Sequence, residues 1–382
     1  MDKPIVLLIH GMGTHEATST TKKFNEGLKE GCDFLGQTGF DLDSIELIEF
    51  NYSDILDKIR KDIAEHAAET AELLPLLTPT VTDSNLIAKI PEMVGKISSM
   101  QTKFGDDEFI YTHLLDVILY AMTMYGSDIR TRCAEAISSN MFRAYAQNRG
   151  FHIVAHSLGT KVVTDTMRDL FDNTATIDNK DKINPNAFRP KSLWMVSNVS
   201  RLVGILDPYG DPQDFSNCIV HDHFDKDTGN KGAAGSMYNL RNKLDPFTWF
   251  KTYKGEPELG SNITFSDVRK IEKESTFINP HDLAEYIANP DVTYRFLATL
   301  FDFSVTPKQY FDGMSAYTAT TVEGTLKGKL ENIKDTFSDT ADGVAEASSL
   351  SDKIDILQSA YEALQKINEE TKVYLSIEEN NQ

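Results

Sequence analysis

Ser157 lies in a stretch whose residue types and spacing are typical of a reactive serine. The sequence AHSLG at 155–159 places a small residue two positions before and two positions after the serine, with Ala155 in place of the glycine of the G-x-S-x-G form. An apolar run rich in strand formers, 151–155, precedes the serine, and a helical pattern, 160–171, follows it. A serine on such a strand-to-helix turn exposes its hydroxyl near a helix N-terminus. The stretch therefore predicts a nucleophilic serine, with a plain structural turn as the alternative.

A turn that contains two glycines follows the first apolar run of the chain. Residues 4–10 (PIVLLIH) are continuously apolar, which is typical of a strand buried on both faces of a parallel sheet. His10, Gly11, Met12 and Gly13 come next, and glycines there let the backbone turn sharply and present N–H groups to a ligand. The spacing differs from the G-x-G-x-x-G of a dinucleotide loop. We expect either a loop that binds a developing oxyanion or a plain strand-to-helix turn.

Six strand patterns alternate with helical patterns up to about residue 300, and these elements must position the reactive groups. Strands are expected at 4–10, 43–52, 151–155, 192–197, 237–243 and 262–268. Helices are expected at 21–34, 127–148, 160–171, from 281 onward and at 292–301. This alternation predicts an α/β fold with a mostly parallel sheet of about six strands flanked by helices.

Two regions do not fit this alternation. Residues 54–125 contain three further helical patterns, although a parallel crossover needs only one helix, so we expect an inserted helical cap. Its apolar helix at 109–124 is expected to be core or the wall of an apolar pocket. The composition changes after residue 303, which divides the chain into a core, 1–303, and a C-terminal helical extension, 304–382.

The C-terminal extension is expected to contain two helices, at 321–337 and 350–374. In the second helix apolar residues recur at spacings of four and three, but only over about two heptads, too few to predict a coiled coil. We expect the two helices to pack on the core or against a second copy of the chain, so that a homo-oligomer could form through them.

Candidate chemical groups follow four of the expected strands. They are Gly11–Gly13 after the first strand, Ser157 after the third, Asp245 after the fifth and His281 after the sixth. The carboxyl ends of parallel strands meet at one edge of a sheet, where function gathers. The four groups are therefore expected to lie close together.

Four motifs resemble those of the α/β-hydrolase superfamily, most closely its lipases and esterases. The motifs are HGMG at 10–13, AHSLG at 155–159, NKLDP at 242–246 and NPHDLAEY at 279–286, in the superfamily's order of oxyanion loop, Ser, Asp and His. The resemblance covers about residues 3–301, does not include the C-terminal extension and is only generic in the cap.

The resemblance implies a role for each group. Ser157 would be the nucleophile, His281 the base that takes its proton, and Asp245 the acid that fixes the tautomer of the histidine. The oxyanion of the tetrahedral intermediate would be held by the backbone N–H groups of Leu158 and Met12.

Several alternatives to these roles stay open. Asp245 could merely form a turn, in which case Asp207, after the preceding strand, is the rival acid. His281 could instead cap a helix. His152 and His156 are expected to pack, or to support the oxyanion site, rather than to act as the base.

Composition narrows the range of partners and cofactors. The formal net charge is −20, the same sign as nucleic acids and anionic membranes, so we expect neither as a main partner. The acidity is also compatible with a saline environment. The histidines and aspartates at 221–227 lack the ligand register of a calcium loop and a third zinc ligand, so we expect no metal and no cofactor.

The location of the protein is inferred from its cysteines and its apolar segments. Three scattered cysteines form no disulfide framework, so we expect a reducing, cytoplasmic location. The N-terminus does not look like a signal peptide. The apolar stretch 114–125 is too short to span a bilayer and contains Asp116, so we expect no stable membrane insertion.

We therefore expect a serine carboxylic-ester hydrolase that cleaves small-molecule esters with short- to medium-chain acyl groups through an acyl-enzyme on Ser157. A thioesterase, acyltransferase or peptidase on the same fold is the alternative, because fold and reactive residues alone do not separate these activities. A more distant alternative is a non-catalytic binding or scaffold protein with this fold.

Overall fold

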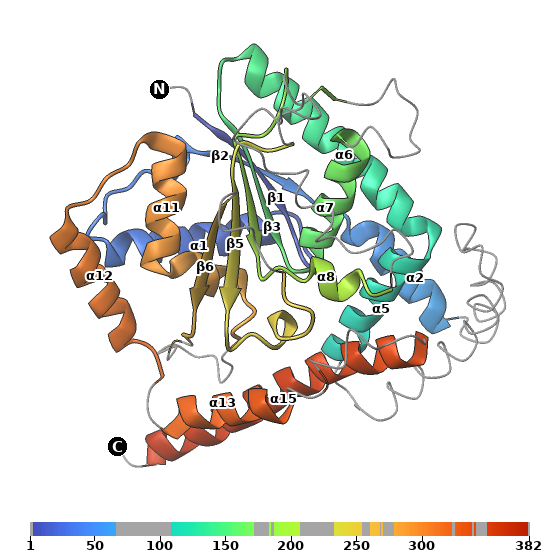
Figure 1. The fold of residues 1–382 in the computed structure, drawn as a ribbon, viewed down its shortest axis with the longest axis vertical. Coiled ribbons are helices and arrows are strands. Elements are labelled where there is room, and N and C mark those ends of the chain that lie inside the picture. The colour runs from blue at the N-terminus through green and yellow to red at the C-terminus, as the bar shows by residue number, and fades with distance from the viewer. Residues whose placement is uncertain are drawn as a thin grey trace, which may run out of the picture.

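A six-stranded sheet forms the centre of the chain (Figure 1). The computed structural model describes residues 3–65, 108–171, 183–184, 187–206, 233–253, 260–267, 269, 279–322, 325–337, 340 and 350–380. The strands are β1 (Ile5–Ile9), β2 (Glu46–Phe50), β3 (Phe151–His156), β4 (Ser192–Val196), β5 (Met237–Asn242) and β6 (Gly260–Phe265). All neighbouring strands pair in parallel. The expected α/β fold, with a parallel sheet of six strands flanked by helices, is confirmed.

The order of the strands, β2-β1-β3-β4-β5-β6, creates a switch point between β1 and β3. From β1 the chain adds β2 on one side and then places β3 to β6 successively on the other side. The register puts Ile9 opposite Ala155, and Ala155 opposite Met195. Residues that follow β1, β3 and β4 therefore meet at one edge of the sheet, which is where ligands bind in open α/β sheets.

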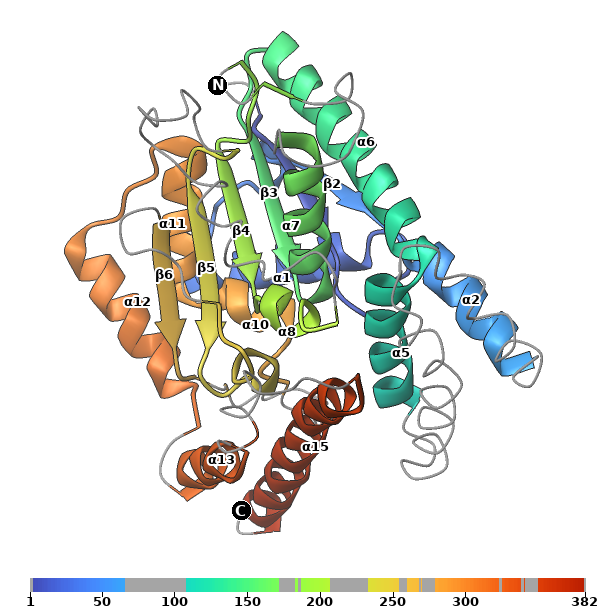
Figure 2. The same cartoon turned by 45° about the vertical axis from the view of Figure 1, so that its right-hand side comes forward.

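Helices cover both faces of the sheet (Figure 2). Alternate side chains of a strand point to opposite faces, so Leu7 joins one hydrophobic cluster and Leu8 joins the other. The helices whose residues join the cluster of Leu7 include α6 (Met124–Ala146) and α7 (Leu158–Phe171). The helices that join the cluster of Leu8 are α1 (Ser19–Phe34), α10 (Leu283–Ala288) and α11 (Pro290–Phe301).

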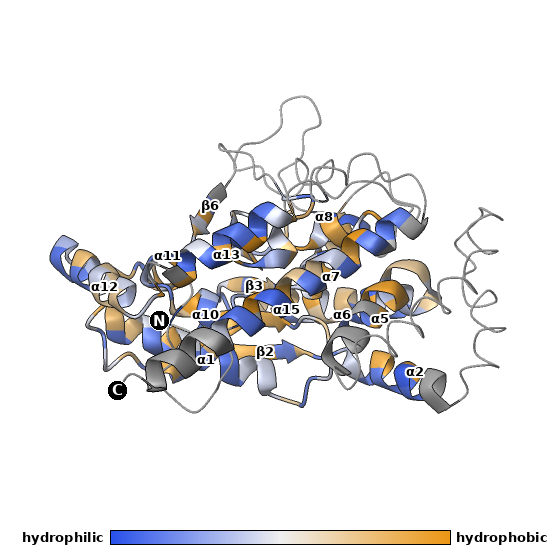
Figure 3. Ribbon diagram, turned by 90° about the horizontal axis from the view of Figure 1, so that it is seen from below, coloured by the Kyte–Doolittle hydropathy of each residue, from blue (hydrophilic) through white to orange (hydrophobic). Residues whose placement is uncertain are grey.

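The cap region begins with α2 (Ser53–Glu65) and ends with α5 (Glu108–Met122). Residues 66–107, and with them the second of the three helical patterns expected in the cap, lie outside the described residues. Helix α5 is largely hydrophobic (Figure 3), and its Leu115, Ile118 and Met122 are buried in the same cluster as the sheet. Of the two interpretations of this helix, the structure supports packing in the core.

Three helices follow α11: α12 (Pro307–Ala319), α13 (Thr325–Thr336) and α15 (Leu350–Asn380). Helices α13 and α15 run beside each other across the edge toward which β5 and β6 point (Figures 1 and 2). Helix α12 was not expected from the sequence, although Thr306 and Gln309 form a capping box there and Pro307 occupies the first turn.

Three short helices complete the described elements: the 3₁₀ turns η1 (Leu42–Ser44) and η4 (Pro246–Thr248), and the helix α8 (Ser200–Val203). Within the described part of the chain, no helix combines the length and the apolar character that crossing a membrane requires.

Candidate active site

Ser157 occupies the sharp turn between β3 and α7. Its φ is +53°, a left-handed conformation that a non-glycine residue adopts only where the surroundings impose it. Three hydrogen bonds hold the turn. The Ser157 N–H donates to the Val196 carbonyl at 3.1 Å, and the N–H and hydroxyl of Thr160 donate to the Ser157 carbonyl at 2.8 and 2.6 Å. Such strain is typical of functional sites.

Two glycines allow the turn at Ser157 to pack against the loop after β1. A Cβ atom at Gly159 would lie 2.5 Å from the His10 carbonyl oxygen and 2.6 Å from that of Ile9. A Cβ atom at Gly11 would lie 2.8 Å from the Ser157 Cβ and 3.3 Å from its Oγ. These positions need glycine because neighbouring backbone, or the serine itself, fills the space that a side chain would require.

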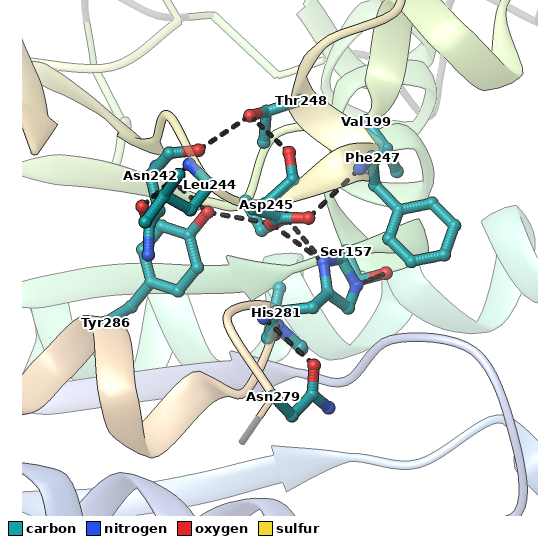
Figure 4. Close-up of polar contacts among 12 residues, drawn as sticks. Ser157, Val199, Asn242, Leu244, Asp245, Phe247, Thr248, Asn279, His281 and Tyr286 are labelled. Atoms are coloured by element: carbon teal, nitrogen blue, oxygen red, sulfur yellow. Dashed lines mark hydrogen bonds and ion pairs between the residues drawn. The ribbon is translucent and has the colours of Figure 1, made fainter. Parts of the chain in front are cut away.

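Ser157, His281 and Asp245 form a hydrogen-bonded chain (Figure 4). The Ser157 Oγ lies 2.8 Å from His281 Nε2, and His281 Nδ1 lies 2.9 Å from Asp245 Oδ2. Their exposed fractions are 1%, 6% and 0%, so all three are buried. The structure thus brings together three residues that the sequence separates by 36 and 124 positions.

Asp245 accepts hydrogen bonds on both carboxylate oxygens. Oδ2 receives the hydroxyls of Ser197 at 2.5 Å and Tyr286 at 2.8 Å in addition to His281, and Oδ1 receives the N–H of Phe247 at 3.0 Å. Burial raises the pKa of Asp245, but the nearby His281 and these hydrogen bonds outweigh it and hold the pKa below its ordinary value. Asp245 is therefore an ionised hydrogen-bond acceptor. It caps the turn η4 and also contacts His281, so the turn-forming role and the contact with the histidine occur together.

The ionised Asp245 determines which nitrogen of His281 carries the proton. A carboxylate is acceptor-only, so Nδ1 must be the donor and Nε2 is left as an acceptor toward the Ser157 hydroxyl. The Ser197 Oγ is also 2.8 Å from Nδ1, which places a second oxygen beside this proton. Neither Ser197 nor Tyr286 was expected from the sequence to be a site residue. Ser197 directly follows β4, and Tyr286 ends the motif that contains His281, so both lay beside recognisable signals.

The segment around His281 is fixed from two sides. The N–H of His281 donates to the Asn279 side chain at 3.0 Å, and His156 Nε2 donates to the His281 carbonyl at 2.8 Å. Burial, with a contribution from His281, lowers the pKa of His156 to about 3, so His156 is neutral and supports the site. Asp282, rather than His281, caps α10, so the helix-capping interpretation of His281 is wrong.

The other histidine beside the serine, His152, lies at the opposite end of β3 and contacts Ser192 Oγ at 2.7 Å through Nδ1. It takes no part in the hydrogen-bonded chain of Ser157 and is a packing residue, which is one of the two roles expected for it.

His10 and Tyr52 shape the loop after β1. His10 Nδ1 donates to the Gly11 carbonyl at 2.7 Å, and the N–H of Tyr52 donates to His10 Nε2 at 3.0 Å. The Tyr52 hydroxyl lies 2.9 Å from the Gly11 carbonyl oxygen, and its ring stacks on that of His10 with centroids 4.0 Å apart. Burial, followed by the proximity of His15, keeps the pKa of His10 well below its ordinary value, so this ring is a neutral support.

Asp116 of α5 fixes the far end of the same loop. Its Oδ2 accepts the N–H of Gly13 at 2.7 Å, and its Oδ1 pairs with the Arg60 guanidinium from α2. Burial raises the pKa of Asp116 to about 6 in spite of Arg60. Because Asp116 takes the Gly13 amide, the amides of Met12 and Leu158 remain the candidate donors to an oxyanion. The sequence alone showed Asp116 only as a charge in an apolar helix.

Two features of the sequence lie outside the described residues: Asp207, the rival acid, and the histidines and aspartates at 221–227, where we expect no metal. Among the residues that the structure describes, no three or more His, Cys, Asp and Glu side chains gather in a way that could hold a metal ion.

Comparison with known protein families, with curated proteins and with solved structures found no match for this chain.

Chemically, the site combines a strained serine, an imidazole whose Nε2 faces the serine hydroxyl, a buried carboxylate and a loop with backbone N–H groups. This set of groups can form and break an acyl bond on the serine.

Proposed function

We propose that this protein is a serine ester hydrolase of the α/β-hydrolase type that works through an acyl-enzyme on Ser157. The observation that carries the proposal is the chain of 2.8 and 2.9 Å contacts from Ser157 through His281 to Asp245. These three residues lie at the carboxyl edge of a parallel sheet. Beside them is the loop after β1, which the buried Tyr52 and Asp116 hold in place. The motif resemblance supports the same conclusion.

In the first half of the proposed reaction the Ser157 Oγ attacks the ester carbonyl carbon while His281 Nε2 takes its proton. Asp245 stabilises the imidazolium that results. The negative charge that develops on the carbonyl oxygen is stabilised by the N–H groups of Leu158 and Met12. The tetrahedral intermediate then collapses, and the leaving alkoxide takes the proton from His281 Nε2.

In the second half a water molecule attacks the acyl-enzyme, and His281 Nε2 takes a proton from it. The acid is released when the second tetrahedral intermediate collapses and the proton returns to the Ser157 Oγ. His281 thus acts first as a base and then as an acid in each half of the reaction, which requires that its Nε2 face Ser157 in both halves.

The groups beside the reactive atoms favour an uncharged, apolar acyl group. Met12 and Leu158, which carry the candidate oxyanion donors, are buried apolar residues, and the Phe247 ring lies 4.6 Å from the His281 ring between centroids. An apolar site discriminates by about 1–3 kcal/mol per methylene that it fits or excludes. We therefore propose esters with short- to medium-chain acyl groups as the substrate class.

The proposal is tested with p-nitrophenyl esters of increasing acyl length, on the wild type and on Ser157→Ala. We expect a maximum at short to medium chains and a loss of many thousandfold in the variant, because only binding and the oxyanion donors remain. A sulfonyl fluoride should label Ser157 in the wild type. The matched control is Ser139→Ala, which removes an exposed serine hydroxyl on α6. Hydrolysis that survives in Ser157→Ala, or labelling at another serine, would contradict the proposal.

A further inference from the structure

Helix α15 crosses the end of the sheet toward which β5 and β6 point (Figure 2), the edge that carries the candidate active site. Its buried hydrophobic side chains in the described part of the chain belong to the same hydrophobic cluster as β1, β3 and α5; they are Ile356, Leu357, Ala360, Tyr361, Ala363, Leu364 and Ile367. The helix also contacts η4, the turn that Asp245 caps. The C-terminal part of the chain is therefore built into the region around Asp245.

Tyr361 of α15 touches both loops of the site. Its hydroxyl donates to the Met12 Sδ at 3.1 Å, and its ring meets the Phe247 ring edge to face with centroids 4.7 Å apart. The residue is 1% exposed, so its position is set by packing. One side chain thus connects the loop after β1 with the turn after β5.

Of the residues that Tyr361 contacts, Phe247 touches groups that the proposed reaction uses, and Met12 carries one of them. Phe247 donates its N–H to Asp245 Oδ1 at 3.0 Å and packs its ring against that of His281. Met12 offers its N–H to the oxyanion in the proposed mechanism. A methionine side chain has three rotatable bonds, so an anchored sulfur restricts the conformations open to the residue that carries it.

We propose that Tyr361 is a positioning residue of the active site, supplied by the C-terminal helix, which holds Met12 and Phe247 at the separation that catalysis requires. This inference rests on the proposed ester hydrolase function. Displacement of a reacting group by about 1 Å can cost about 10²-fold in rate, so a contact that fixes two loops at once has a measurable effect.

The test compares Tyr361→Phe, which removes only the hydroxyl, with Tyr361→Leu, which also removes the ring. We expect kcat on p-nitrophenyl butyrate to fall about five- to tenfold in Tyr361→Phe, as for the loss of one hydrogen bond. In Tyr361→Leu we expect a loss of about 10²-fold. KM should change little in Tyr361→Phe, because the loss falls on the transition state. The kcat is expressed per active site titrated with a sulfonyl fluoride, so that unfolded protein does not contribute.

The matched control is Tyr253→Phe. The Tyr253 hydroxyl also contacts a methionine sulfur, that of Met237 at 3.7 Å, but Met237 is the first residue of β5, at the end opposite Asp245. This variant should keep the wild-type kcat.

A double-mutant cycle with Met12→Leu shows whether the contact between the hydroxyl and the sulfur is responsible. In that background Tyr361→Phe should have no further effect on kcat, because the sulfur acceptor is already absent.

The outcomes separate the inference from the function on which it rests. A wild type that hydrolyses none of the esters and is not labelled at Ser157 contradicts the proposed function itself. A wild type that is active, with Tyr361→Phe and Tyr361→Leu equal to it in kcat per titrated site, overturns the role of Tyr361 and leaves the function intact. A fall in thermal stability without a fall in kcat per site overturns that role as well.

Discussion

Gly11→Ala tests the close approach between the loop after β1 and the reactive serine. The added Cβ atom would lie 2.8 Å from the Ser157 Cβ and 3.3 Å from the Ser157 Oγ. The backbone of Gly11 does not have the positive φ that Gly13 and Gly36 have, so alanine fits the local conformation. The substitution therefore acts through the contact with Ser157 and not through backbone strain.

The size of the effect follows from this geometry. Carbon atoms in contact prefer separations of about 3.5–4.0 Å, so the loop and the serine must separate by about 0.7 Å or more. Overpacking of this kind costs about 1–3 kcal/mol in the free energy of unfolding. Because the shift falls on the nucleophile and on the loop with the Met12 amide, we expect kcat to fall by about 10²-fold.

The assay measures kcat per titrated active site on a p-nitrophenyl ester, together with thermal unfolding. The control is Gly328→Ala in α13, where the added Cβ atom meets no atom within 4 Å. That variant should keep its kcat and gain about 0.5–1 kcal/mol of stability, because alanine is the better helix former. If Gly11→Ala folds and keeps the wild-type kcat, the reasoning about this contact is refuted.

Two further predictions concern Asp245 and His152. In Asp245→Asn we expect kcat on the same ester to fall on the order of 10⁴-fold, the size known for a Ser-His-Asp site whose histidine is left in the wrong tautomer; a loss below tenfold would mean that Asp245 does not orient His281. Burial, followed by the charge of Lys191, lowers the pKa of His152 to about 3. As the pH falls, the His152 imidazole is therefore protonated in the unfolded chain before it is protonated in the folded protein. The stability that His152 contributes should therefore be complete above about pH 6.5 and decrease toward pH 3 by up to about 1.4 kcal/mol per pH unit. Urea unfolding at several pH values should show a shallower decrease in His152→Gln, and an equal decrease in both proteins would contradict this.

The sheet could be predicted because its signals are local. A strand such as β1 is buried on both faces and therefore consists of a continuous apolar run, which stands out from the surrounding sequence. The regular alternation with helices then fixes a parallel arrangement, since parallel strands need a crossover. The capping box at Thr306 is an equally local signal, and α12 could have been expected from it.

The three central residues of the candidate site could be named because each follows a strand and their order along the chain is informative. The groups that support them could not be named, because their positions depend on tertiary packing. Ser197 reaches Asp245 only because β4 and β5 are neighbours in the sheet. Asp116 reaches Gly13 from 103 residues away, and no pattern in either segment indicates the partner.

Substitutions far from the site should matter most where a loop, rather than the sheet, positions a group that the proposed reaction uses. Ser157 directly follows β3, so the sheet itself positions it, and Asp245, three residues after β5, caps the 3₁₀ turn η4. Met12 also lies three residues beyond a strand, β1, but its loop contains no helix or 3₁₀ turn. Its conformation depends on contacts from three separate segments, through Tyr52, Asp116 and Tyr361. We therefore expect the proposed oxyanion donor to be the part of the site most sensitive to changes outside it, including changes in the cap and in the C-terminal helix that contact this loop.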